Sequence, residues 1–356
     1  MKALAVRPSA HQVELIELPE PRLETPTQVK LRILEVGICG TDREICEFHY
    51  GTPPPGEEYL VIGHESLARV LEVGSQVTSL RLGDLVVPTV RRPCQRSECP
   101  ACQVGRQDFC FTGEFSERGI KGLHGFNTEL VVEDERYLIR VPEALRPWGV
   151  LVEPLTIAEK ALLQVHDVQE RLPWQTSDRP LRALVLGAGP VGLLGAMLFQ
   201  ARGFATTVYS RDPAGSPRAR LVESLGATYH PGPLADIKEV DFIYEAVGAS
   251  ELAFAAIELL GPNGIFCFTG VPGRKGAINL ESGDLMRRLV LKNQVVFGTV
   301  NSGRDGFENA VRDLAEFRRL FPEALDSLIT GRFPVADYRQ VLLNGKGGIK
   351  NVFRWT

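Results

Sequence analysis

Four cysteines stand close together in one short stretch of the chain, at a spacing typical of a metal site. The stretch is polar and contains proline and glycine, and the four thiols are those of Cys94, Cys99, Cys102 and Cys110. Four thiolates spaced in this way hold a structural zinc in a closed tetrahedron. The alternatives are buried free cysteines, which suit a polar stretch poorly, and a nucleic-acid-binding zinc ribbon, which suits a net charge of −4 poorly. We therefore expect a structural zinc lobe at residues 94–110.

A second set of residues has the types that a catalytic zinc takes. Cys39, His64 and Glu65 offer a thiolate, an imidazole and a carboxylate, and each lies near the end of an expected strand. Three such ligands leave one position of a tetrahedral zinc open for substrate or water. Glu153 is a fourth candidate ligand, where the first domain runs into the second. The sequence thus predicts a catalytic zinc whose ligands lie far apart along the chain.

Two residues beside Cys39 have supporting roles in this hypothesis. Asp42 is expected to accept the second ring N–H of His64 and so to fix the tautomer of the imidazole. Thr41 and Glu44 have the spacing of a capping box, which predicts a short helix after them. Capping and substrate contact are compatible roles for Thr41, although one hydroxyl hydrogen serves only one of them at a time.

A count of charges constrains the fourth ligand. If Cys39, Glu65 and Glu153 all bind as anions beside a neutral His64, three negative charges meet the two positive charges of zinc. A net negative site is a poorer Lewis acid. We therefore expect one glutamate, Glu153 rather than Glu65, to hold the zinc loosely or through water. With a single thiolate, this site should also lose zinc to chelators sooner than a thiolate-rich site.

Residues 181–203 predict a strand, a tight turn and a helix. The apolar run 183–186 is followed at once by a GxGxxG pattern. Gly187 permits the turn, Gly189 lets the backbone approach a pyrophosphate, and Gly192 lets the helix pack closely on the strand. A glycine-rich connection without a chemical role is the alternative, but the flanking strand and helix favour dinucleotide binding at the helix N-terminus. The residues expected to contact the dinucleotide here are Gly187, Gly189, Pro190, Val191 and Gly192.

The residues at the end of the next expected strand indicate which dinucleotide binds. An acidic side chain about 20 residues past the glycines would bind the ribose 2′-hydroxyl of NAD. Ser210 and Arg211 stand there instead, and a hydroxyl with a guanidinium suits a 2′-phosphate. The alternatives are that Arg211 is only a surface arginine, or that Asp212 turns inward and serves NAD. We expect NADP as the preferred cofactor and NAD as a second one.

The first part of the chain indicates the strands that must position the zinc ligands. Residues 1–90 read as β-rich, with short runs separated by turn signals at 29–34, 66–73 and 85–87. The segment 51–56 contains three successive prolines and is expected to be a loop.

The rest of the chain alternates between helix and strand patterns. A helical pattern at 158–168 precedes a polar linker at 173–180. The strands expected after it are 183–186, 206–209, 241–244, 265–268 and 295–297. Such alternation predicts a doubly wound α/β domain. An amphipathic helix around 307–321 and a returning strand at 349–355 end the chain.

Composition limits the classes of partner. The 356 residues are 44% hydrophobic and 24% charged, and a net charge of −4 gives no electrostatic footprint for nucleic acid. No apolar run approaches the length of a membrane span, so no membrane partner is expected. Seven cysteines, four of them bunched, favour metal binding in a reducing compartment over a disulfide framework. We expect a soluble cytoplasmic protein.

Taken together, the motifs resemble those of a known family. GICGTD, GHE, the four-cysteine lobe, VEPL and GAGPVG have the order and spacing of the zinc-dependent medium-chain alcohol dehydrogenases. Within that family the chain is most similar to the archaeal type of glucose 1-dehydrogenase, through GTDREI, VVPTVRRP, SERGIKGLHGF, DFIYEAVG and GTVNS. The resemblance implies a GroES-like β-rich catalytic domain at 1–152 and a Rossmann dinucleotide-binding domain at 153–304. Residues 305–356 would then return to the catalytic domain.

The same resemblance implies roles for individual residues. Cys39, His64 and Glu65 would hold the catalytic zinc, with Glu153 nearby as a zinc ligand or as a partner through water. Glu153 would also contact the substrate. Thr41 matches the residue whose hydroxyl contacts the reacting alcohol and starts the proton path. The other positions implied are Glu114 and Asn301, at the sugar or the nicotinamide end, and Lys350, at the cofactor phosphates.

The resemblance implies an activity as well. It is the oxidation of an aldose, D-glucose or D-galactose, at C1 to the lactone, by hydride transfer to NADP or NAD. Two zinc ions per subunit and a homodimer or homotetramer are implied with it, with the 295–297 strand as a candidate for pairing between subunits. A polyol or secondary-alcohol dehydrogenase would share every metal motif. An NADP-binding sensor or scaffold is the non-enzymatic alternative, but a protein without catalysis needs no open metal site.

Overall fold

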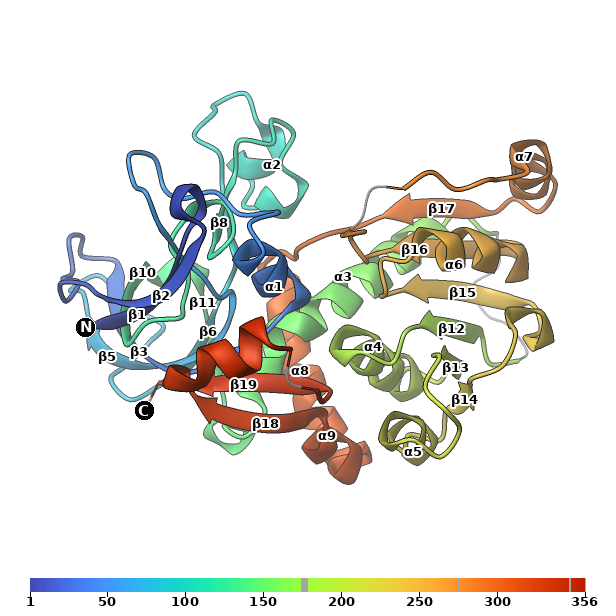
Figure 1. Cartoon of the computed structure of the whole chain (residues 1–356). Coiled ribbons are helices and arrows are strands. Elements are labelled where there is room, and N and C mark those ends of the chain that lie inside the picture. Colours follow the sequence, from blue (N-terminus) through green and yellow to red (C-terminus); the bar gives the residue numbers. More distant parts are fainter. Residues whose placement is uncertain (174–178, 274–275, 346, 356) are drawn as a thin grey trace. The chain divides into compact units, whose positions relative to one another are not determined.

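The chain divides into two units, seen in a computed structural model that describes residues 1–173, 179–273, 276–345 and 347–355 (Figure 1). The first unit comprises Met1–Thr156, Asn301–Leu314 and Ile329–Thr356, and the second comprises Ile157–Val300 and Ala315–Leu328. The prediction that all of 305–356 returns to the first domain is therefore wrong for residues 315–328. That segment belongs to the second unit because helix α9 (Pro322–Leu328) packs against α5 (Pro217–Ser224). Residues 174–178 of the predicted linker lie outside the described residues.

The first unit is built on a sheet of seven strands, most of them antiparallel. In spatial order six of them are β11 (Leu138–Val141), β6 (Leu85–Pro88), β5 (Glu65–Val73), β3 (Gln28–Gly37), β19 (Lys350–Arg354) and β18 (Ile329–Pro334), and β10 (Leu130–Asp134) also pairs with β3. The C-terminal strands, red in Figure 1, thus join a sheet made mainly of N-terminal ones. Two smaller sheets contain β2 (Gln12–Glu17), β1 (Lys2–Arg7) and β4 (Leu60–Val61), and β7 (Arg91–Arg92), β8 (Ser116–Arg118) and β9 (Gly122–Leu123).

Strand β3 shows why these residues form strands. Val29, Leu31 and Ile33 are fully buried, while Lys30 and Arg32 between them are not. Such alternation buries one face of a strand and exposes the other. The buried face packs into an apolar core under the sheet. The predicted strands at 29–34, 66–73, 85–87 and 349–355 are confirmed, each with small shifts at its ends.

The second unit contains a parallel sheet of six strands. Their order is β14 (Thr228–His230), β13 (Ala205–Tyr209), β12 (Arg182–Leu186), β15 (Val240–Glu245), β16 (Leu260–Phe268) and β17 (Val295–Gly298). The strand order reverses at β12, which is the topological switch point where doubly wound folds bind their ligands. The predicted α/β fold class is confirmed, and the sequence missed only β14 among the described strands of this sheet.

The structure describes nine α-helices, and the bounds of two of them differ from the predicted ones. They are α1 (Gly40–Cys46), α2 (Pro100–Gln103), α3 (Val152–Gln169), α4 (Pro190–Ala201), α5, α6 (Ser250–Ala256), α7 (Ser282–Leu291), α8 (Arg304–Leu320) and α9. Helix α3 begins six residues before the predicted 158–168, so Glu153 lies in its first turn. Helix α8 ends at Leu320 because Pro322 begins the next helix. Among the described residues, no helix combines the length and the apolarity that crossing a membrane requires.

Candidate zinc and dinucleotide sites

The predicted catalytic zinc ligands meet in the first unit. The ligand atoms of Cys39, His64 and Glu65 all lie within 4.8 Å of one another. Cys39 directly precedes α1, Glu65 begins β5 and His64 directly precedes it. Thiolate, imidazole and carboxylate within this range fit a zinc ion with one open position. The sequence therefore identified a set of ligand types that folding does bring together.

Asp42 contacts two of these ligands. Its Oδ2 accepts a hydrogen bond from the Cys39 backbone N–H at 2.8 Å, and its Oδ1 lies 3.5 Å from Nδ1 of His64. The Asp42 and His64 side chains are both buried, so this ion pair is shielded from water. The structure thus places Asp42 where it can orient the His64 ring, as the sequence suggested.

The charges around Asp42 and His64 support each other. Burial disfavours the charged form of Asp42, yet the neighbouring His64 keeps the pKa of the Asp42 carboxyl below its usual value. Burial also disfavours the imidazolium, but Asp42 and Cys39 hold the pKa of His64 well above its usual value. A ligating imidazole is neutral, so zinc binding at His64 would displace a proton.

The predicted capping box of Thr41 and Glu44 is wrong. Because α1 begins at Gly40, its N-cap is Cys39, and Asp42 supplies the carboxylate that reaches back to the N-cap backbone. The Thr41 hydroxyl lies 3.9 Å from Sγ of Cys39. Since capping does not engage it, this hydroxyl is available at the edge of the ligand cluster.

Lys350 occupies a place that the sequence did not predict. Its side chain is buried and its ammonium forms an ion pair with Oε2 of Glu65. The contact with the cofactor phosphates that the resemblance implies for Lys350 stays a prediction. It also donates to the Ile38 carbonyl oxygen at 3.0 Å. Burial opposes the ammonium, yet Glu65 and Cys39 raise the pKa of Lys350 above its usual value. The earlier charge count therefore lacked one positive charge, contributed by Lys350 beside Glu65.

Glu153 interacts electrostatically with His64 and Glu65 but is not one of the three mutually close ligands of this cluster. Burial raises the pKa of the Glu153 carboxyl to about 7, with His64 opposing the rise and Glu65 adding to it. A carboxyl that keeps its proton is a weaker metal ligand. This supports the hypothesis that Glu153 holds zinc loosely or through water, which stays a prediction.

Gly37 makes room for the cluster. A Cβ at this position would collide with Oε2 of Glu65 and approach Cε of Lys350 to 2.9 Å. Only glycine lets β3 run this close to the ion pair. The sequence offered no signal for this requirement, because it depends on the pairing of β3 with β19 and β5.

The four-cysteine lobe forms as predicted. The Sγ atoms of Cys94 and Cys102 lie 3.6 Å apart, and those of Cys99 and Cys110 lie 3.9 Å apart. Four sulfurs about 2.3 Å from one zinc would stand about 3.8 Å from each other. Burial opposes the Cys110 thiolate, but hydrogen bonds from Thr112 lower the pKa of Cys110 to about 6. Burial raises the pKa of the Cys102 thiol to about 12, so zinc binding would have to displace its proton. The four thiols therefore fit a closed tetrahedral zinc site in their geometry.

Two predicted substrate contacts have different surroundings. Glu114 is half exposed and accepts hydrogen bonds from Nε and NH2 of Arg96 at 2.7 and 3.0 Å. Asn301 is 7% exposed, with a φ of 56° and an Oδ1 that has no hydrogen-bond partner within the described part of the chain. A buried amide oxygen without a partner is a group that a ligand would satisfy. Both substrate contacts stay predictions.

The glycine turn of the second unit has the expected backbone. Gly187 has a φ of +105°, and a Cβ there would lie 2.6 Å from Cγ2 of Val247. A Cβ at Gly192 would collide with the Gly187 carbonyl oxygen, while a Cβ at Gly189 would meet nothing within 4 Å. Helix α4 begins at Pro190, followed by Val191. The turn thus leaves open space at the position where a pyrophosphate would approach the backbone.

The residues after β13 are arranged around Asp212. The Ser210 hydroxyl donates to Oδ2 of Asp212 at 3.0 Å, and NH1 of Arg218 donates to the same oxygen at 3.2 Å. Arg211 is exposed. The sequence missed Arg218, which lies in the first turns of α5. Two guanidiniums and a hydroxyl at this strand end suit a phosphate, and Asp212 is already engaged.

Fold and sites together define a zinc-dependent medium-chain dehydrogenase. Residues 25–143 match the family model of the alcohol dehydrogenase GroES-like domain, and residues 146–355 match that of the glucose dehydrogenase C-terminus. The chain belongs to the glucose dehydrogenase family.

Relatives of full length support this assignment. The glucose 1-dehydrogenase of Methanocella arvoryzae is 39% identical over 98% of both chains, and that of Thermoproteus tenax is 41% identical over 99% of both. Among solved structures, the Haloferax mediterranei glucose dehydrogenase in complex with NADP, Zn and gluconolactone is 33% identical. It superposes with a TM-score of 0.89, covering 100% of this chain and 99% of the other.

Proposed function

We propose that this protein oxidises an aldose, D-glucose before D-galactose, at C1 to the lactone with NADP as hydride acceptor and NAD as a second acceptor. The observation that carries the proposal is the cluster of Cys39, His64 and Glu65 with the Thr41 hydroxyl beside it. The full-length relatives that bear the name glucose 1-dehydrogenase support the choice of sugar.

The residues of the chain have separate roles in this reaction. Zinc and NADP, when bound, supply Lewis-acid polarisation of the anomeric hydroxyl and acceptance of the C1 hydride. Cys39, His64 and Glu65 hold the metal, and Asp42 orients His64. Thr41 accepts the proton of the anomeric hydroxyl and passes it to water, so that the C1–H bond breaks as the C1=O bond forms.

Substrate comparison with metal removal tests the proposal. Initial rates of NADP reduction are measured with D-glucose, D-galactose, xylose, sorbitol and a simple secondary alcohol, before chelation, after it and after zinc return. We expect aldose turnover that chelation abolishes and zinc restores. Because the catalytic site has one thiolate and the lobe has four, activity should vanish when about one zinc per chain has left. Turnover of sorbitol or the alcohol without any aldose would instead favour a polyol dehydrogenase, and no turnover would favour a sensor or scaffold.

Cofactor choice rests on Arg211. We expect Arg211→Ala to weaken NADP binding by roughly ten- to a hundredfold and to leave NAD binding unchanged, because a charge-assisted hydrogen bond to the 2′-phosphate is lost. Fluorescence titration of each dinucleotide measures both affinities. Arg319→Ala, an exposed arginine of the same unit paired with Glu316, is the control. An unchanged NADP preference in Arg211→Ala would remove this residue from the cofactor site.

A homodimer or homotetramer is part of the proposal. Strand β17 lies at the edge of its sheet, and α7 before it exposes Met286, Val290 and Leu291 by 66% or more. An apolar helix face beside a free sheet edge is a surface that a second copy would cover. Light scattering of the native protein and of Met286→Glu/Val290→Glu tests this. If the double variant keeps the native mass, the subunits meet elsewhere.

A cytoplasmic location is also proposed. All seven cysteines are free of disulfides, as a reducing compartment would keep them. Export of the protein to the medium or the cell surface, seen on fractionation of its natural host, would overturn this.

A further inference from the structure

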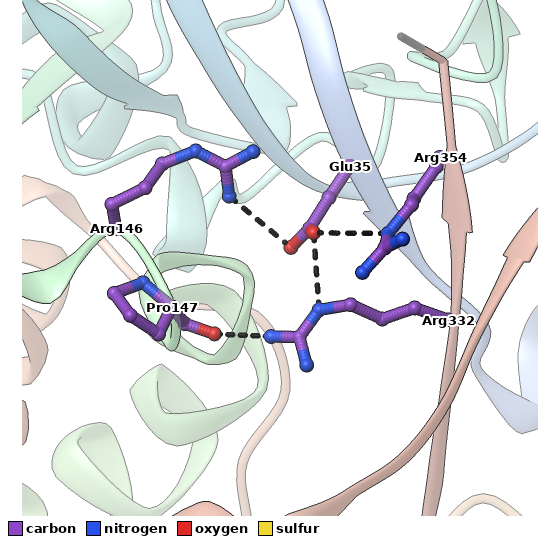
Figure 2. Close-up of a pocket in the computed structure, with 5 residues that line it drawn as sticks. All are labelled: Glu35, Arg146, Pro147, Arg332 and Arg354. Carbon is purple, nitrogen blue, oxygen red and sulfur yellow. Dashed lines mark hydrogen bonds and ion pairs between the residues drawn. The ribbon is translucent and has the colours of Figure 1, made fainter.

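Three arginines surround one buried glutamate in a cavity of the first unit (Figure 2). The cavity has a volume of about 420 Å³ and is lined by Glu35, Arg146, Pro147, Arg332 and Arg354. Glu35 comes from β3, Arg332 from β18 and Arg354 from β19, and Arg146 follows a short 3-10 helix. None of these residues has a role in the proposed oxidation, so the cavity needs its own explanation.

The three guanidiniums share a single carboxylate. Nε of Arg332 donates to Oε1 of Glu35 at 3.1 Å, and its NH2 donates to the Pro147 carbonyl oxygen. NH1 of Arg146 lies 3.5 Å from Oε2 of Glu35, and Nε of Arg354 lies 4.0 Å from Oε1. One negative charge neutralises one of the three positive charges, so the lining residues leave two positive charges without compensation.

The arrangement holds the arginines open towards a ligand. Glu35 is 3% exposed and its Oε2 has no partner with hydrogen-bond geometry in the part of the chain that the structure describes. Side-chain exposure rises from 25% at Arg332 to 54% at Arg354, so the cavity opens to solvent at Arg354. The buried carboxylate fixes Arg332 and lies close to Arg146. Ligand binding would therefore cost less side-chain conformational entropy than it would with freely moving arginines.

We propose that this cavity binds a phosphate group, carried by a small organic phosphomonoester or present as inorganic phosphate. Planar guanidiniums bind phosphate through paired hydrogen bonds. A phosphomonoester carries roughly 1.5 to 2 negative charges at neutral pH, which matches the two uncompensated positive charges. The volume lies within the range of about 300 to 1,000 Å³ common for small-molecule sites, so an organic group fits beside the phosphate.

Calorimetric titration of the zinc-loaded enzyme tests the proposal. NADP is kept saturating, because the N-terminus of α4 would otherwise offer a second place for an anion. Inorganic phosphate, glycerol 3-phosphate and glycerol are titrated separately. We expect one saturable anion site per chain that weakens with salt, and no binding of glycerol. Binding of the ester alone identifies an organic phosphate as the ligand, and binding of both identifies the phosphate group itself.

Two variants tie the binding to the cavity. Arg354→Gln should lower phosphate affinity by about tenfold, because one charge-assisted contact is lost. Arg140→Gln changes an exposed arginine of the same unit that pairs with Asp84, and it should leave affinity unchanged. Glu35→Gln keeps an oxygen that can accept from Arg332 but removes the negative charge, so affinity should rise because the cavity then has one more uncompensated positive charge. A cluster with a purely structural role would not respond in this way.

Either of two results would overturn the proposal. No saturable binding of either anion to the wild-type enzyme contradicts it. Equal affinity in the wild type and Arg354→Gln also contradicts it, because the anion would then bind elsewhere. If Glu35→Gln fails to fold, the comparison of Arg354→Gln with Arg140→Gln still decides the question.

Discussion

The two predicted zinc sites of the first unit are built in opposite ways. The four-cysteine lobe takes all its ligands from residues 94–110, and the apolar cluster around them contains little besides the cysteines and Ala101. Val104 in the lobe and Phe111 directly after it are more than 70% exposed. The Cys39 cluster instead lies on a seven-stranded sheet with its own large core, and strands from both ends of the chain surround it.

This difference indicates what each metal does for the protein. In the lobe, a metal takes the place of a hydrophobic core, as is common in small metal-stabilised segments. At the Cys39 cluster, the sheet fixes the ligands before any metal binds, so that the metal is left for chemistry. Removing a ligand should therefore change activity at one site and stability at the other.

The largest expected effect is the loss of activity on changing His64. His64→Ala should lower kcat/KM by about a thousandfold or more, because Lewis-acid stabilisation is worth several kcal/mol. Circular dichroism should still report the native fold. Cys46→Ala is the control, since Cys46 is a buried free thiol at the end of the same α1 that follows Cys39, and it should keep its activity. If His64→Ala turned over at the native rate, the cluster would not be the active site.

The opposite result is expected in the lobe. Cys110→Ser should lower the thermal midpoint by several degrees and expose residues 94–110 to proteases, because a closed zinc site contributes folding free energy directly. The rate of turnover at the Cys39 cluster should be unchanged at temperatures below the thermal midpoint. The measurements are differential scanning fluorimetry, limited proteolysis and zinc content, which should fall by one ion per chain. A stable variant that had lost only activity would reverse the roles assigned to the two sites.

The same contrast explains what could be predicted from the sequence. The lobe is local, so the spacing of Cys94, Cys99, Cys102 and Cys110 was enough to predict it. The ligand types at the other cluster were also recognisable, and so was the glycine turn of the second unit. Most strands could be predicted as well, because a strand buried on both faces reads as an apolar run and a strand buried on one face alternates apolar and polar residues, as β3 does.

The sequence missed features that depend on contacts between distant segments or on where a helix begins. The ion pair of Lys350 with Glu65 is one of them, because only the pairing of β19 with β3, which matches Val352 to Gly37, brings Lys350 to Glu65. The capping box failed because α1 begins two residues earlier than the Thr41 spacing implied, with Cys39 rather than Thr41 as its N-cap. Strand β14 is short and only partly buried, so its three residues lack an apolar run.

A smaller effect is expected for Asp42, which supports a ligand without binding the metal. Asp42→Asn keeps the shape and the contact with the Cys39 backbone but removes the charge beside His64. Outer partners of this kind contribute roughly 10- to 100-fold to metal affinity. Zinc competition with a fluorescent chelator should show such a loss at the catalytic site alone, with the lobe zinc retained. Equal weakening of both zinc ions would mean that the variant had disturbed the fold of the unit.

The smallest expected effect concerns Glu114, a residue just after the lobe that is predicted to contact the sugar. Its ion pair with Arg96 is exposed, and such pairs contribute little because water and salt screen them. If Glu114 contacts the sugar, Glu114→Gln should raise the KM for glucose on the order of fivefold, as expected for one hydrogen bond, with kcat unchanged. Arg96→Gln removes the same ion pair and should leave KM unchanged, and neither variant should move the thermal midpoint. A rise of KM in both variants would assign the effect to the ion pair, and no rise in either would confine Glu114 to the surface of the lobe.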